Sequence, residues 1–115
     1  MNTKDSYFYS AHMRPIFTDI PLNFPIYERE DIIGYEAVDI ENPRQHYWIK
    51  VQHKNIISNR LYPGDLVLVY PQETAKIGQS IIGISAKRKM LSMKKYQEGD
   101  IVYGVPVLII RKCSK

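Results

Sequence analysis

The stretch VQHKNIISNRLYPGDLVLV, residues Val51 to Val69, carries the clearest fold signal in this chain. It opens with the end of a predicted strand, crosses a polar segment, and turns at Pro63-Gly64-Asp65 into a second strand, Leu66 to Tyr70. Proline presets the first dihedral angle of such a turn, glycine accepts a positive one, and the aspartate can bond nearby backbone amides. The nearly continuous apolar run after the turn is typical of a strand buried on both faces.

Further strands are predicted on both sides of this stretch. Residues 47–51 have the β-branched and aromatic composition of a strand. Residues 79–85 and 89–95 are predicted to form a hairpin, and residues 101–111 form the last strand, bent or bulged at 104–106. No stretch has the sustained period of a long amphipathic helix. We therefore expect a mostly β domain with a small, partly closed sheet and few or no long helices.

The length of 115 residues predicts one domain with a single hydrophobic core. We place this β domain at residues 21–115. Residues 1–20 show neither a helical nor a strand period, so they are predicted to form an N-terminal arm. The arm would pack over the sheet or against another subunit, where its aromatic side chains would serve as anchors.

Composition predicts a cytoplasmic protein without a membrane segment, metal or cofactor. No apolar run reaches the roughly eighteen residues that a membrane helix needs, and the N-terminus lacks the apolar block of a signal peptide. The single cysteine, Cys113, cannot form an internal disulfide, which fits a reducing compartment. Its position in the C-terminal tail favours a solvent-facing or interface thiol over a reactive one. The histidines are not spaced like a zinc motif.

The opening stretch resembles the C-terminal domain of LexA, of CI-type phage repressors and of UmuD-like proteins. In that family a hydrophobic residue is followed by a Gly-variable-Ser-Met segment, a Gly-Asp turn and an apolar strand. Val51, Gly64-Asp65 and Leu66 to Val69 match this pattern without a gap. The family cleaves itself with a serine–lysine dyad, but the position of the serine falls on Asn55. The resemblance therefore implies the family's β fold without its nucleophile.

Three other segments support the resemblance. EDIIGYE at 30–36 follows Pro25-Ile26 as it does in CI-like relatives, and GQSIIG at 78–83 resembles the strand after the second turn. LSMKK at 91–95 resembles the strand that carries the catalytic lysine, which would be Lys94.

The chain also departs from the family. Leu22-Asn23 stands where self-cleaving relatives have a small pair, usually Ala-Gly. A strand and loop between the lysine strand and the last strand are missing. Only about twenty residues precede the matching region, so the repressors' DNA-binding domain is not expected either.

The resemblance implies a non-catalytic regulatory or oligomerisation domain in transcriptional, phage or SOS-type control. In relatives the last strand pairs with its two-fold mate, and an apolar strand here could do the same. The partner would be a second copy or a repressor-type protein. If Lys94 is buried, the amide oxygen of Asn55 could accept a hydrogen bond from it. The predicted dimer-interface residues are Val105, Val107, Leu108, Ile109 and Ile110.

Two alternatives remain open from the sequence. Ser58 could act with Lys94 as a residual peptidase, because a desolvated lysine can accept a serine proton. The net charge of +4 is concentrated in part at Lys87, Arg88 and Lys89, a basic patch that could bind nucleic acid. No aromatic residue lies within residues 87–95 to stack on bases, which makes nucleic acid the minority expectation.

Overall fold

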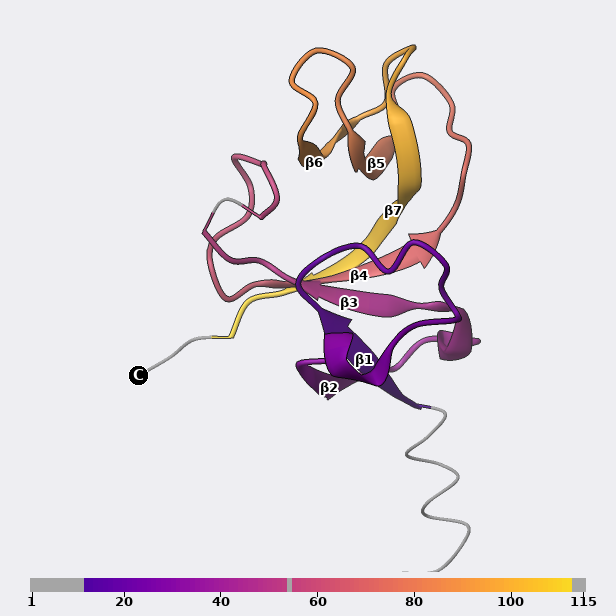
Figure 1. Ribbon diagram of the computed structural model, residues 1–115, viewed down its shortest axis with the longest axis vertical. Coiled ribbons are helices and arrows are strands. Elements are labelled where there is room, and N and C mark those ends of the chain that lie inside the picture. Colours follow the sequence, from indigo (N-terminus) through magenta and orange to yellow (C-terminus); the bar gives the residue numbers. More distant parts are fainter. Residues whose placement is uncertain (1–11, 54, 113–115) are drawn as a thin grey trace, which may run out of the picture.

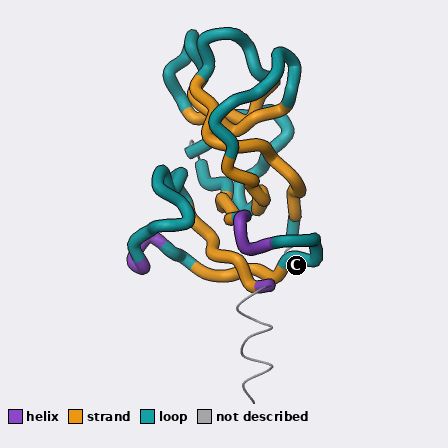
Figure 2. The backbone as a smooth tube through the Cα atoms, turned by 90° about the vertical axis from the view of Figure 1, so that its right-hand side faces the viewer, coloured by secondary structure: helices purple, strands orange, loops and turns teal. Residues whose placement is uncertain are grey.

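The computed structural model describes residues 12–53 and 55–112 and confirms a mostly β fold (Figure 1). The described residues form seven strands and two short 3-10 helices, η1 (Arg29–Asp31) and η2 (Pro43–Gln45). The strands are β1 (Met13–Phe17), β2 (Gly34–Ala37), β3 (Tyr47–Lys50), β4 (Leu66–Pro71), β5 (Ser80–Ile84), β6 (Leu91–Lys95) and β7 (Ile101–Ile110). Figure 2 shows the same body from the side, with loops joining the strands.

The strands form one open sheet in the order β2-β1-β3-β4-β7-β5-β6. All neighbours are antiparallel except β1 and β3, which run parallel. β5 and β6 stand together as a hairpin at one end of the molecule, and the long strand β7 connects them to the rest of the sheet (Figure 1). The predicted hairpin and last strand are confirmed.

Hydrophobic side chains pack on both faces of the central strands, as the run at residues 66–70 predicted. On one face, Val67 and Val69 pack with Ile49 and Phe17. On the other face, Leu66 and Leu68 pack with Trp48 and Ile16. This division follows from the alternation of side chains along a strand, because successive residues point to opposite faces. β3 and β4 are therefore the centre of the sheet.

The prediction of an arm over the sheet is wrong for the segment Met13–Phe17. This segment is a strand within the sheet, between β2 and β3. Arg14 and Pro15 interrupt its apolar alternation, so the local sequence did not show a strand period. The segment becomes a strand because it pairs with two segments that are distant in sequence, Gly34–Ala37 and Tyr47–Lys50. Residues 1–11 of the predicted arm and Cys113 lie outside the described residues.

The Pro63-Gly64-Asp65 turn is confirmed, and its aspartate is held more firmly than predicted. Gly64 has a φ of +97°. The Asp65 carboxylate, 1% exposed, accepts a hydrogen bond from the Tyr62 amide at 2.9 Å. Both of its oxygens also accept hydrogen bonds from the Arg111 guanidinium, at 3.0 and 2.9 Å. This ion pair connects the turn before β4 to the residue that follows β7.

β7 changes neighbours along its length. Its first residues, 101–104, pair with β5, whereas residues 104–110 pair with β4. The two pairings have register irregularities opposite Ile82/Gly83 and Leu68/Val69. These irregularities leave Tyr103 and Val107 as the extra residues of β7, on either side of the bend predicted at 104–106. After Gly104 the strand therefore runs beside β4 alone.

Candidate functional site

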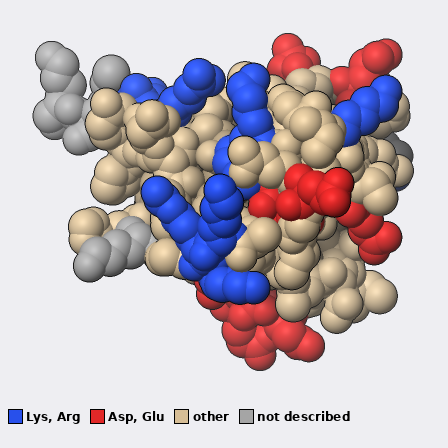
Figure 3. All heavy atoms as spheres, turned by 90° about the horizontal axis from the view of Figure 1, so that it is seen from above, with Lys and Arg blue, Asp and Glu red and all other residues tan. Residues whose placement is uncertain are grey.

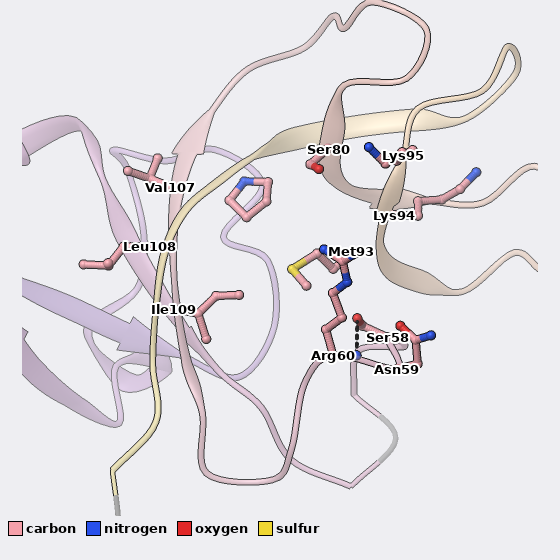
Figure 4. Close-up of a pocket in the computed structure, with 11 residues that line it drawn as sticks. Ser58, Asn59, Arg60, Ser80, Met93, Lys94, Lys95, Val107, Leu108 and Ile109 are labelled. Atoms are coloured by element: carbon pink, nitrogen blue, oxygen red, sulfur yellow. Dashed lines mark hydrogen bonds between the residues drawn. The ribbon is translucent and has the colours of Figure 1, made fainter.

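A groove of about 510 Å³ lies beside the second half of β7 (Figure 4). Its walls come from residues 106–109 of β7, residues 93–95 of β6, Ser80 of β5 and the loop at residues 58–60. The loop is tied to β6, because Ile57 and Ser92 form a parallel bridge. The groove therefore occupies the space that opens where β7 leaves the hairpin.

The side of β7 that faces this groove is a free strand edge. Residues 105–110 have β4 on one side and no strand of the described residues on the other. Three apolar side chains of this half are exposed: Val107 by 46%, Leu108 by 42% and Ile109 by 40%. Of the five predicted interface residues, these three are therefore accessible. Val105 and Ile110 are half-buried, and Ile110 packs against the Trp48 core.

The side chains around the groove point in different directions (Figure 4). Ile109, Met93 and Arg60 point toward one another across it, whereas Val107 and Leu108 point to the other side of β7. Met93 also packs against the buried core. The groove thus has an apolar base with a guanidinium group beside it.

The predicted hydrogen bond between Asn55 and Lys94 is wrong. The Asn55 amide donates to the carbonyl oxygens of Thr18, at 3.0 Å, and Lys50, at 2.9 Å. Its Oδ1 accepts from the Gln52 amide at 2.8 Å. Asn55 therefore stabilises its own turn and joins it to the residue after β1. An amide with two donors and an acceptor suits this position, where a serine hydroxyl would make fewer bonds.

Lys94 has a different partner, the carboxylate of Asp100. That carboxylate is 2% exposed and also accepts hydrogen bonds from the amides of Ala86, at 3.0 Å, and Gln97, at 2.9 Å. The hydrogen bond from Lys94, the main cause, and those from the two amides lower the pKa of Asp100 to about 2. Lys94 thus connects β6 to the turn before β7, and its ammonium group is engaged in an ion pair.

The Ile57–Ser92 bridge explains why Asn55 and Lys94, the positions of the family's catalytic dyad, are not hydrogen-bonded to each other. In this parallel pairing, Asn55 precedes Ile57 by two residues, whereas Lys94 follows Ser92 by two. The two positions therefore extend from the bridge in opposite directions.

Ser58 and Lys94 both line the groove, but no hydrogen bond between them is present. The Ser58 hydroxyl oxygen accepts a hydrogen bond from the Arg60 amide at 3.1 Å. In Figure 4 the Lys94 side chain points away from Ser58. The pair would need a rearrangement of the loop before the lysine could accept the serine proton.

The predicted basic patch lies elsewhere, at the tip of the β5–β6 hairpin. Lys87, Arg88 and Lys89 are all exposed there. The tip is shaped by Ser85, which accepts a hydrogen bond from the Lys89 amide at 2.8 Å. In Figure 3, which looks down on this end of the molecule, Lys and Arg side chains gather beside a group of acidic ones. The patch remains a predicted nucleic-acid surface and is separate from the groove.

Sequence reasoning missed two residues of the groove, Arg60 and Lys95. Both are exposed, and neither side chain makes a hydrogen bond or ion pair with the residues that the structure describes. Their positions in sequence carry no signal of proximity, because only the Ile57–Ser92 bridge brings the loop to β6.

Across residues 12–53 and 55–112, no group of histidine, cysteine and acidic side chains could hold a metal ion. Within the same ranges, no helix is long and apolar enough to cross a membrane. No protein-family model matches this chain, and no curated protein matches its sequence. The resemblance to the LexA and CI-type domains therefore stays a prediction.

Proposed function

We propose that this protein is a non-catalytic regulatory or oligomerisation module that associates with another protein chain through the second half of β7. The added strand would come from a second copy or from a repressor-type protein, as the resemblance to CI-type domains implies. One observation carries the proposal. A strand of ten residues is paired on only one side over residues 105–110, with Val107, Leu108 and Ile109 exposed.

Physical chemistry supports an association role for such an edge. Unpaired backbone amides and carbonyls form a template for another strand, and proteins usually cover or charge the edges that they do not use. Residues 105–110 carry no charged side chain. Pro106 has no amide and Val107 is the extra residue of the register irregularity, so the regular part of this edge is residues 108–110. The charges nearby belong to Arg111 and Lys112, after the strand ends, and to the opposite wall of the groove.

Sedimentation velocity from micromolar to millimolar protein tests the proposal. We expect reversible self-association at the high end, and we expect Ile109→Lys to abolish it, because a lysine at a strand edge opposes edge-to-edge pairing. The matched control is Ile101→Lys. Ile101 lies in the same strand and is 55% exposed, but at this residue β5 covers the edge of β7 that is open beside Ile109.

Self-association that is equally weak in both variants, or unchanged in both, would contradict the proposed use of β7. A wild-type chain that stays monomeric throughout would refute the homodimer. In that case the hetero-association is tested by peptide binding, as described below.

A further inference from the structure

We propose that the groove beside β7 binds an extended, acidic segment of a partner protein, which adds to the free half of β7 as a further strand. The inference rests on the proposed function, because it takes the free half of β7 as the working surface. It goes further by naming the chemistry of the partner.

The backbone of β7 supplies the affinity for a strand of any sequence. In strand addition, main-chain hydrogen bonds hold the peptide, and the side chains around the edge select its sequence. Here the selecting surface is the groove that borders residues 106–109. Ile109 and Met93 offer apolar contact to alternate side chains of the incoming strand (Figure 4).

The charge of the groove points to an acidic segment. Its lining contains three cationic side chains, Arg60, Lys94 and Lys95, and no acidic one. Lys94 is already paired with Asp100. Arg60 and Lys95 have no such partner among the described residues and are exposed. Two positive charges on the wall opposite β7 therefore remain to be matched, and a guanidinium group suits bidentate binding of a carboxylate.

The same charges disfavour a second copy of this chain in the groove. A two-fold pairing of β7 centred on Leu108, the middle of its exposed residues, would place Arg111 of the copy opposite Val105. Lys112 of the copy would follow it. Both cations are already neutralised within their own chain, Arg111 by Asp65 and Lys112 by Glu36. Residues 101–112 contain no acidic side chain, so the strand of the copy would bring no carboxylate to Arg60 and Lys95. A partner strand with acidic side chains matches these two charges better.

Fluorescence anisotropy with labelled short peptides tests this inference. The probe is a peptide of alternating valine and glutamate, and its counterpart has lysine in place of glutamate. A third peptide has the sequence of residues 104–111 and represents the second copy. We expect the glutamate peptide to bind at least about tenfold more tightly than the other two, with an affinity that falls as salt is added. The glutamate peptide with N-methylated backbone amides should not bind, because it cannot donate hydrogen bonds along a strand edge.

Charge reversal in the groove provides the decisive comparison. Arg60→Glu and Lys95→Glu should weaken binding of the glutamate peptide about tenfold each and shift the preference toward the lysine peptide. Lys87→Glu at the hairpin tip makes the same change in net charge and should leave both affinities unchanged. All three positions are exposed, so thermal unfolding of each variant should match the wild type.

The outcomes separate this inference from the proposed function. If the peptide of residues 104–111 binds as well as the glutamate peptide, the free edge is in use but its preference for acidic segments is refuted. If Lys87→Glu weakens binding as much as Arg60→Glu, the attraction is non-specific and the groove is not the site. If the N-methylated peptide binds normally, strand addition is refuted. If no peptide binds and the chain does not self-associate, both proposals fail.

Discussion

The two halves of β7 differ in what lies beside them. Residues 101–104 are in contact with β5, and Gly104 also pairs with Pro71 of β4. Residues 105–110 have β4 alone, and three of their apolar side chains are exposed. The edge of β7 that β5 covers at the start of the strand is therefore open at its end.

This difference shows that stability and association can be assigned to separate parts of one element. In the first half, the backbones approach so closely that two glycines are required. A Cβ atom on Gly104 would lie 2.6 Å from the Tyr70 carbonyl oxygen, and one on Gly83 would lie 2.1 Å from that of Ile101. In the second half, side chains have room and face solvent or the groove. Variants at these two glycines should therefore destabilise the protein, and variants at the exposed side chains of the second half should change its associations.

The largest expected effect is that of Gly83→Ala, which attacks the first half of β7. The added methyl group would collide with the Ile101 carbonyl, so β5 and β7 must separate. We expect the free energy of unfolding to fall by about 3 kcal/mol, measured by urea titration. Gly34→Ala in β2 is the control, since its Cβ would meet only the Ile16 side chain at an ordinary 3.6 Å. Equal stabilities of the two variants would show that the close approach of β5 and β7 is not required.

A smaller effect is expected from Asp100→Asn, which loosens the turn leading into the first half. The Asp100 carboxylate accepts hydrogen bonds from two amides and from Lys94, so we expect a loss of about 1–2 kcal/mol at neutral pH. Its folded pKa of about 2 lies below the ordinary value of 3.8. The stabilisation is therefore present above pH 4 and is lost as the pH falls from about 4 to about 2.

Unfolding free energies measured across that pH range check the assignment. In the wild type they should fall with acidification, and in Asp100→Asn the fall should be shallower. The hydrogen bonds from Arg111 to Asp65, the main cause, also lower the pKa of Asp65, so part of the acid sensitivity should remain. An unchanged pH profile in Asp100→Asn would show that this carboxylate is not linked to folding.

The smallest effect on stability is expected from Ile109→Lys in the second half. The side chain is 40% exposed and lies at a free edge, so the free energy of unfolding should change by no more than about 0.5 kcal/mol. Guanidinium unfolding, measured at a protein concentration where the chain is monomeric, gives this change in the free energy of unfolding without a contribution from association. A loss of unfolding free energy as large as that of Gly83→Ala would mean that the second half of β7 is needed for stability. The proposed difference between the two halves would then be wrong.

Local patterns predicted much of the sheet. β3, β4 and the β5–β6 hairpin lie where alternation and composition placed them, and Gly64 and Asp65 form the predicted turn. Each of these signals acts over a few residues. β1 was missed because Pro15 hides its pattern, and because its strand partners are distant in sequence.

The site was predictable only in part. The exposed apolar residues Val107, Leu108 and Ile109 were among those predicted for an interface, but the groove that borders them was not. The hydrogen-bond partners of Asn55 and Lys94 also differ from those predicted, because Asn55 bonds to its own turn and to Thr18, and Lys94 pairs with Asp100 in the turn before β7. Sequence spacing does not specify which turn forms hydrogen bonds with a given polar side chain.

By itself, the sequence determined the strands from β3 to β7, the turn before β4 and the two apolar faces of β4, because side-chain alternation and turn chemistry are local properties. Only the tertiary structure decided that β7 exchanges one neighbour for another at Gly104, and that Arg60 and Lys95 both line the groove beside its open edge. Those features depend on the register of strands far apart in the chain. Register is selected by the packing of the whole sheet rather than by any single segment.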